Sequence, residues 1–399
     1  MPEPFTENSP TKHAEKPRGS LLELSLLFLR LGFTAIGGPA VHIAMMEEEV
    51  VTRRGWLTRA EFLDLLSATN LIPGPNSTEM AIHVGRVRAG GRGLLVAGIS
   101  FILPAALMVG CLAWAYVRYG ALPQIAALLY GVKPVVIVVL AQGALRLGRS
   151  AVKSAWLAVL GVLAMVAAAL GVDALLTLFA AGALAGLVRL RSGFRSPNLA
   201  MGLLGPGGGV ATGAFAVPFS LTRLFLVLLK IGATLFGGGY VLVAFLRSDL
   251  VARLGWLTEQ QLLDAVAVGQ VTPGPLFTTA TFVGYVLGGV RGAVLGTVAI
   301  FLPAFVLVAA SGPLVSRLRR SSTAGAVLDG INVAALALMV LVSAQLARSA
   351  IVDWFTLGLA ALGALLLMRY RVNSAWLVLG AAAAGGLMVW LGMSGPRFQ

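Results

Sequence analysis

The feature that most constrains this chain is an internal repeat. Residues 30–75 align with residues 230–275 at a constant spacing of 200, and 17 of the 46 aligned positions are identical. One deletion then shifts the spacing to 199, which aligns Leu103-Pro104-Ala105 with Leu302-Pro303-Ala304. Such long self-similarity indicates two copies of one structural unit. We therefore predict a polar tail at 1–20, a first repeat at 21–190, a Gly- and Pro-rich linker at 191–220 and a second repeat at 221–395.

The composition places both repeats in a membrane. Charged residues make up 12% of the 399 residues, against about 25% in soluble domains. Hydrophobic residues make up 58% and the mean hydropathy is +0.90, which is too apolar for a surface that faces water. The net charge of +14 comes from Lys and Arg that punctuate apolar runs, which argues against a nucleic-acid partner. We predict an all-α polytopic membrane protein that is surrounded by lipid.

The charge-free runs predict about ten transmembrane helices, because about 20 apolar residues cross the hydrocarbon core of a bilayer. The first repeat supplies crossings near 21–46, 93–117, 121–147, 153–171 and 173–190. The second repeat supplies crossings near 221–246, 293–316, 324–347, 353–369 and 373–394. The first crossing of each repeat is interrupted by paired glycines, Gly37-Gly38 and Gly237-Gly238.

A stretch too polar for a simple crossing follows the first crossing of each repeat. It holds an amphipathic piece, then Pro73-Gly74-Pro75 or Pro273-Gly274-Pro275, then a short second piece. Proline removes a backbone donor and disfavours helix at the preceding residue, so each motif separates two half-helices. We predict two re-entrant helical hairpins, whose irregular backbone must be buried in protein or line a watery cavity.

Five crossings per repeat is an odd number, so we predict that the two repeats are inserted upside down relative to each other. The charge bias between loops gives a check. With the amino terminus outside, 18 of the 30 Lys and Arg residues fall in inner loops, nine in outer segments and three within spans.

Inverted repeats with broken helices are typical of secondary transporters, whose substrate binds near the membrane midplane. A helix start presents unpaired N–H groups and the positive end of its dipole, so two starts facing each other would bind an anion rich in oxygen. The predicted ligands at these starts are Asn76, Ser77, Thr78, Thr278 and Thr279. Backbone at Gly37, Gly38, Gly237 and Gly238 would approach the anion closely. The alternative is that these residues only cap and pack helices.

Three basic residues lie within predicted spans, where a charge is costly enough to imply a partner or a pathway. Arg30 and Lys230 occupy equivalent positions, and two such cations suit a divalent anion. The alternative is that both extend to the lipid headgroups. Lys133 lies in the middle of a span, and its counterpart is Asn332, so we expect the binding site to be asymmetric there.

Two titratable residues follow the first Pro-Gly-Pro motif. Glu79 and His83 lie one helical turn apart and are candidates for proton coupling. The alternative for Glu79 is that a first-turn carboxylate simply stabilises its helix. For the repeated aspartates we expect salt bridges, Asp64 with Arg53 and Asp264 with Arg253.

Several enzyme classes are excluded by missing motifs. The chain has no Walker-type phosphate loop, no dinucleotide fingerprint, no HExxH and no GxSxG. Its single cysteine excludes an intrachain disulfide and a multi-cysteine metal site. We therefore predict that the protein is not an enzyme, that it has no catalytic residues, metal or cofactor, and that ion gradients supply its energy.

The paired motifs resemble those of the chromate ion transporter family, in its long-chain, two-domain form. They are Phe236-Gly237-Gly238-Gly239-Tyr240, Gly255-Trp256-Leu257-Thr258, Thr272-Pro273-Gly274-Pro275 and Thr281-Phe282-Val283-Gly284-Tyr285, with Gly37-Gly38-Pro39, Gly55-Trp56 and Ile72-Pro73-Gly74-Pro75 in the first half. The resemblance implies export of chromate across a bacterial inner membrane, chromate resistance and driving by the proton motive force. It makes protons the coupling ion, sulfate the natural competitor and a homodimer a candidate assembly. Family members are described with the amino terminus inside, opposite to the charge count, so both orientations stay open.

Two other functions remain open at this point. The chain could take up or exchange sulfate or another anion. It could also be a non-transporting membrane scaffold or sensor, although paired proline-broken hairpins would then have no purpose.

Overall fold

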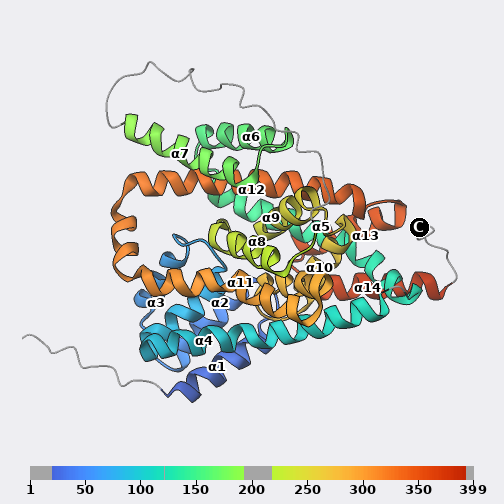
Figure 1. The fold of residues 1–399 in the computed structure, drawn as a ribbon, viewed down its shortest axis with the longest axis horizontal. Coiled ribbons are helices and arrows are strands. Elements are labelled where there is room, and N and C mark those ends of the chain that lie inside the picture. Colours follow the sequence, from blue (N-terminus) through green and yellow to red (C-terminus); the bar gives the residue numbers. More distant parts are fainter. Residues whose placement is uncertain (1–19, 121, 193–217, 392–399) are drawn as a thin grey trace, which may run out of the picture.

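The computed structural model of the chain describes residues 20–120, 122–192 and 218–391, and all regular secondary structure in them is helical (Figure 1). Almost all of the predicted polar tail and most of the predicted linker lie outside these residues. The first repeat contains α1 (Leu21–Thr34), α2 (Pro39–Glu47), the π-helix η1 (Glu48–Arg53), α3 (Arg59–Thr69), α4 (Asn76–Tyr119), α5 (Pro123–Ala151), α6 (Ala155–Ala169) and α7 (Ala174–Ser192).

The second repeat contains the same series of elements. They are α8 (Leu221–Thr234), α9 (Val241–Leu246), the π-helix η2 (Arg247–Arg253), α10 (Glu259–Val271), the 3₁₀-helix η3 (Leu276–Thr278), α11 (Thr279–Arg320), α12 (Ser322–Ala350), α13 (Trp354–Met368) and α14 (Ser374–Trp390). Both predicted kinds of interruption are confirmed. Helix α1 ends before the paired glycines and α2 begins after them, and Pro73-Gly74-Pro75 separates α3 from α4.

Helices α4 and α11 each fold back on themselves. The backbone leaves the helical region at Ala89 and Gly90 in α4, and at Gly288 and Gly289 in α11. In α4, Gly85 and Gly93 then touch backbone to backbone, because a Cβ on either would collide with the carbonyl oxygen of the other. Thr281 and Thr297 lie 2.7 Å apart, hydroxyl to hydroxyl, across the same fold in α11. The half-helix that follows each Pro-Gly-Pro motif therefore turns back tightly into the next helical segment.

The last helices of each repeat pack on the other repeat. Helices α13 and α14 pack against α5, and helices α6 and α7 pack against α12 (Figure 1). Gly131 of α5 meets the backbone of Ala381, and Gly330 of α12 meets the backbone of Ala181. Small residues at such crossings let membrane helices approach closely. Helix α4 contacts α11, α5 contacts α12, and the contact of α1 with α4 is matched by that of α8 with α11, as a pseudo-twofold axis requires. The contacts of α10 with α5 and α14 have no comparable counterpart at α3.

Five helices are long and apolar enough to cross a membrane, namely α4, α5, α7, α11 and α12, and α6, α13 and α14 are shorter apolar helices among the described residues. The predicted crossings 21–46 and 221–246 fall on α1–α2 and α8–α9. Helix α1 has 14 residues and spans about 21 Å, so it crosses only part of a bilayer before the glycine break. The chain is an all-α polytopic membrane protein built from two repeats.

Candidate functional site

The two Pro-Gly-Pro loops cross at the pseudo-twofold axis. The Gly74 N–H donates to Leu235 O at 2.9 Å, and the Gly274 N–H donates to Ala35 O at 3.0 Å. Leu235 and Ala35 follow the ends of α8 and α1, where the helix breaks leave carbonyl groups without a helical partner. Each hairpin of one repeat is thus held by the broken helix of the other.

Space at this crossing is limited by residues that recur in both repeats. A Cβ added to Gly274 would lie 2.6 Å from Ala105 Cβ, and one added to Gly74 would lie 3.7 Å from Ala304 Cβ. Ala105 and Ala304 are the last residues of the repeated Leu-Pro-Ala motif. The motif therefore supplies a small residue opposite each loop glycine.

The glycine breaks have backbone conformations that side chains rarely adopt. Gly37 and Gly38 have φ of 127° and 83°, and Gly237 and Gly238 have φ of 90° and 97°. Glycine adopts positive φ readily because it has no Cβ, which explains the paired glycines at both breaks. His42 follows the first glycine break and aligns with Leu242 of the second repeat. Its Nε2 lies 3.0 Å from Ala35 O, so the imidazole supports the carbonyl that accepts the Gly274 N–H.

The helix starts after the Pro-Gly-Pro motifs are buried. Ser77, Thr78, Thr278 and Thr279 are each at most 3% exposed. The Thr278 and Thr279 hydroxyls donate to carbonyls of their own turn, at 2.9 Å and 2.8 Å. The Thr78 hydroxyl has no partner among the described residues. No side chain caps either start, because Pro75 and Pro275 occupy the N-cap positions. Capping therefore does not account for these residues.

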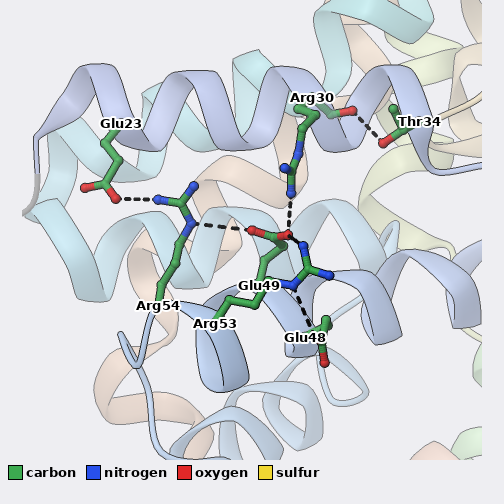
Figure 2. Close-up of polar contacts among 7 residues, drawn as sticks. All are labelled: Glu23, Arg30, Thr34, Glu48, Glu49, Arg53 and Arg54. Carbon is green, nitrogen blue, oxygen red and sulfur yellow. Dashed lines mark hydrogen bonds and ion pairs between the residues drawn. The ribbon is translucent and has the colours of Figure 1, made fainter.

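Arg30 lies in a cluster of ion pairs at the junction of α1 and η1. Arg30, Arg53 and Arg54 all reach the carboxylate of Glu49, and Arg54 also pairs with Glu23 (Figure 2). The cluster borders a cavity of 710 Å³ that is lined by Arg30, Thr34, Glu48, Glu49 and Arg53 together with apolar side chains of α2. The charged residues that line the cavity are two arginines and two glutamates, so this cavity carries no excess positive charge.

The second repeat builds the same ion pair at the equivalent positions. Lys230 Nζ lies 2.7 Å from Asp249, and Arg253 lies 2.8 Å from the same carboxylate. Asp249 aligns with Glu49 at the spacing of 200. The cost of placing Arg30 and Lys230 within predicted spans is thus offset by a carboxylate in each repeat.

We expect the ion pairs of Glu49 with Arg30, Arg53 and Arg54 to make the free energy of unfolding depend on pH under acidic conditions. Burial by itself raises the pKa of Glu49, but the hydrogen bond and charge of Arg30, the charge of Arg53 and the hydrogen bond from Arg54 outweigh it, and the pKa is lowered from 4.5. The stabilisation is therefore present above about pH 4.5 and is lost as the pH falls through the lowered pKa of the folded state.

The check compares the unfolding of wild type and Glu49→Gln in detergent between pH 7 and pH 3.5. The difference in free energy of unfolding between wild type and Glu49→Gln should be largest at neutral pH and should decrease below about pH 4.5. Glu48→Gln is the control, because Glu48 is half exposed and pairs only with Arg53 among the described residues. A difference that stays constant with pH would contradict the expectation.

A second buried cluster joins the two repeats. Asp264 of α10 accepts a hydrogen bond from the Tyr116 hydroxyl at 3.0 Å, and Lys133 Nζ lies 3.4 Å from its other oxygen. The predicted pairing of Asp264 with Arg253 is wrong, because Arg253 pairs with Asp249 in the preceding turn of η2. In the first repeat the equivalent Asp64 is exposed. The predicted asymmetry at Lys133 therefore extends to its carboxylate partner.

Glu79 and His83 lie inside the first hairpin. Glu79 is fully buried, and neither of its carboxyl oxygens has a partner among the described residues. Its Oε1 lies against Gly74, the glycine whose N–H donates to Leu235 O. His83 is 6% exposed and its Nε2 is also unpartnered in the described part of the chain. An unpaired ionised carboxylate is costly to bury, so a proton or another cation must neutralise Glu79.

Sequence reasoning missed the carboxylate partners of the basic residues. Glu49 and Asp249 align at the spacing of 200, as do Arg30 and Lys230. That parallel is a signal for a repeated ion pair. No comparable signal points to the contact of Lys133 with Asp264, because their counterparts are Asn332 and the exposed Asp64.

Comparisons with known proteins match both halves of this architecture. The model of the family described as Chromate transporter matches residues 22–187 and again residues 222–387. The chromate transport protein of Cupriavidus metallidurans is 32% identical over 94% of both chains. The chromate transport protein of Pseudomonas aeruginosa is 32% identical over 97% of this chain and 96% of its own. A probable chromate transport protein of Synechococcus elongatus is 30% identical over 94% of this chain and 97% of its own.

No solved structure matches the chain. The relatives are named as transport proteins, in agreement with the prediction that the chain is not an enzyme. The resemblance inferred from the paired glycine and Pro-Gly-Pro motifs is confirmed by matches that cover both repeats. With a repeated, membrane-spanning helical fold whose two halves each fit the same family model, this chain belongs to the chromate transporter family.

Proposed function

We propose that the protein is a secondary active transporter that exports chromate from the cytoplasm across the bacterial inner membrane and so confers chromate resistance. The names of its relatives support chromate as the substrate. The proposed mechanism depends mainly on the reciprocal contact between the two repeats. The Gly74 N–H donates to Leu235 O, and the Gly274 N–H donates to Ala35 O. Broken helices that meet at the interface of two repeats are the usual substrate site of secondary transporters.

The two repeats, 21–190 and 221–395, are inverted in this proposal, with the pseudo-twofold axis in the membrane plane. The hairpins then enter from opposite sides, and their helix starts face one central place. Chromate would bind there to backbone at the glycine breaks and to Asn76, Ser77, Thr78, Thr278 and Thr279. Lys133 would supply a positive charge from one side only. Arg30 and Lys230 would reach the anion only after release from Glu49 and Asp249.

The membrane potential favours export of a dianion. Moving one elementary charge across 100 mV is worth about 2.3 kcal/mol, so two charges contribute about 4.6 kcal/mol per 100 mV. A potential negative inside therefore drives chromate outward even without an exchanged ion. A pH gradient adds to this only if the protein carries protons, and Glu79, with His83 one turn away, is the candidate carrier.

The deciding experiment measures uptake of labelled chromate into everted vesicles, where export appears as uptake. In one arm the membrane potential is clamped with valinomycin and potassium while the pH gradient is varied. In the other arm the pH gradient is held constant while the membrane potential is varied. We expect flux with either gradient and competition by sulfate. Sulfate transport without chromate transport would favour a general anion carrier. No flux of either anion from purified protein in liposomes would favour a scaffold or sensor.

The role of Glu79 is tested with Glu79→Gln, which keeps the shape of the side chain but cannot ionise. We expect this variant to retain flux driven by the potential and to lose its dependence on the pH gradient. His83→Gln is the companion variant. Unchanged dependence of flux on the pH gradient in Glu79→Gln would remove Glu79 as the coupling residue.

Binding at the centre is tested with Arg30→Ala, Lys230→Ala and the pair Thr78→Val and Thr278→Val. Loss of a hydrogen bond to a charged group is worth about 1.5–3 kcal/mol, or roughly tenfold to 100-fold in affinity. Flux that is indifferent to all of these substitutions would overturn the site while leaving the family assignment intact.

A further inference from the structure

An arginine-rich cavity lies away from the hairpin crossing. Its volume is 490 Å³, and it lies between α5 and the turn that joins α13 to α14. Three of its lining residues are Arg146, Arg149 and Arg371, and none of its lining residues is acidic. None of the three arginines makes an ion pair with a carboxylate among the described residues. This cavity therefore differs from the charge-balanced cavity at Arg30.

The polar residues contributed by α5 share one face of the helix. Gln142, Arg146 and Arg149 are spaced by four and then three residues, which places their side chains one above another. In the second repeat the aligned residues are Leu341, Gln345 and Arg348. Only the first repeat therefore carries this polar face complete.

Arg371 is held in a backbone conformation that its side chain disfavours. It has a φ of 55° and is the only residue other than glycine with positive φ among the described residues. The matching turn of the first repeat, between α6 and α7, reaches positive φ one position earlier, at Gly171 with a φ of 89°, and the residue aligned with Arg371 is Val172. Glycine is the usual residue with positive φ after a helix, because it has no Cβ to clash. The second repeat thus accepts strain to place a guanidinium here, which points to a use for the charge.

The cavity lies next to the glycine breaks. Asn373, two residues after Arg371, donates to Ile36 O at 3.2 Å, and a Cβ on Gly37 would touch its side chain at 3.0 Å. On the α5 side, Gly143 is next to Gln142 and faces the ring of Tyr240, whose hydroxyl reaches Gly38. Chain neighbours of the cavity residues therefore reach the first glycine break, Asn373 directly and Gly143 by way of Tyr240.

We propose that Gln142, Arg146, Arg149 and Arg371 form a binding site for a tetrahedral divalent oxyanion, through which the anion reaches the centre of the protein. Guanidinium groups offer paired N–H donors that match two oxygens of such an anion. The Gln142 amide, which lies 3.5 Å from Leu367 O, adds a neutral donor. The function of the site in transport rests on the proposed function, but anion binding at these residues does not.

The test measures binding separately from flux. Labelled sulfate and labelled chromate are dialysed against the purified full-length protein in detergent without anionic lipid. The variants are Arg146→Gln, Arg149→Gln and Arg371→Gly, with Arg348→Gln as the matched control at the α12 position equivalent to Arg149. We expect the dissociation constant to rise about tenfold or more in each of the three variants and less than twofold in the control.

Arg371→Gly also separates the charge from the fold. Glycine relieves the strained backbone, so this variant should unfold at a temperature no lower than wild type while it binds the anion more weakly. An affinity unchanged in all three variants would overturn the site. Weaker binding in Arg348→Gln equal to that in the three variants would overturn it as well, because it would reflect a general effect of net charge.

The same chemistry would also hold the phosphate of a lipid headgroup. Nanodiscs of phosphatidylcholine, with and without phosphatidylglycerol, distinguish the two sources. We expect sulfate binding in phosphatidylcholine alone and no displacement by phosphatidylglycerol. The site for a free anion would be overturned if sulfate did not bind and phosphatidylglycerol were retained in a way that depends on the three arginines. Intact binding without chromate flux would instead count against the proposed function and leave this site standing.

Discussion

Replacing Gly274 with valine is expected to abolish chromate flux and to destabilise the protein by about 2–5 kcal/mol. Gly274 has a φ of 95°, and a Cβ there would lie 2.6 Å from Ala105 Cβ. The larger side chain would push the second hairpin away from Ala35 O and break one of the two bonds that cross between the repeats. Flux in proteoliposomes and chemical unfolding in mixed micelles measure the two effects.

The matched control is Gly255→Ala. Gly255 also has positive φ, at 64°, but no atom lies within 4 Å of the position of its Cβ. Only backbone strain of about 1 kcal/mol is expected there, with flux retained. If Gly274→Val transports as well as Gly255→Ala does, the crossing of the hairpins is not central to the mechanism.

Replacing Lys133 with methionine is expected to destabilise the protein by about 3 kcal/mol, because it leaves the buried Asp264 carboxylate without its cation. The side chain of Asp264 is 5% exposed and that of Lys133 is 17% exposed, so water screens this pair little. Among the described residues, Tyr116 would then be the one hydrogen-bond partner that the carboxylate keeps. Unfolding of wild type and variant under the same conditions gives the difference.

A double-mutant cycle separates structure from substrate binding at Lys133. The double variant Lys133→Met with Asp264→Asn removes both charges and keeps an acceptor for Tyr116, so it should recover much of the lost stability. Strictly additive effects would contradict a direct interaction between the two side chains. Recovery of stability without recovery of flux would assign Lys133 to the anion as well, whereas recovery of both would make the pair purely structural.

The last two helices of each repeat pack on the other repeat, and this packing affects the expected results for both the Gly274 and the Lys133 variants. Helices α13 and α14 pack on α5, and helices α6 and α7 pack on α12, so each of these long helices is covered largely by the last two helices of the other repeat. Motion of one repeat relative to the other must therefore carry the partner's last two helices with it. The hairpin crossing and the pair of Lys133 with Asp264 are polar contacts of this shared interface.

Much of the local architecture could be predicted from the sequence. The spacing of 200 indicated two copies, the apolar runs indicated membrane helices, and the paired glycines and Pro-Gly-Pro motifs indicated where helices break. These predictions succeeded because each depends on a property of the local chain. Proline lacks an N–H, glycine tolerates positive φ, and apolar residues avoid water wherever they lie.

Which charged groups meet depends on the folded structure. Residue type and hydropathy indicate that Arg30, Lys230 and Lys133 lie in apolar segments and need partners. The partners are Glu49, Asp249 and Asp264, and packing of the helices selects them. The fold also places Arg371 beside α5. In the sequence, Arg371 is one of the loop charges, which indicate only the orientation of the chain in the membrane. Any carboxylate attracts any cation, so residue type only narrows the set of possible partners. The attraction between two charges falls with the distance between them, so the pairs that form are those that the fold brings close together.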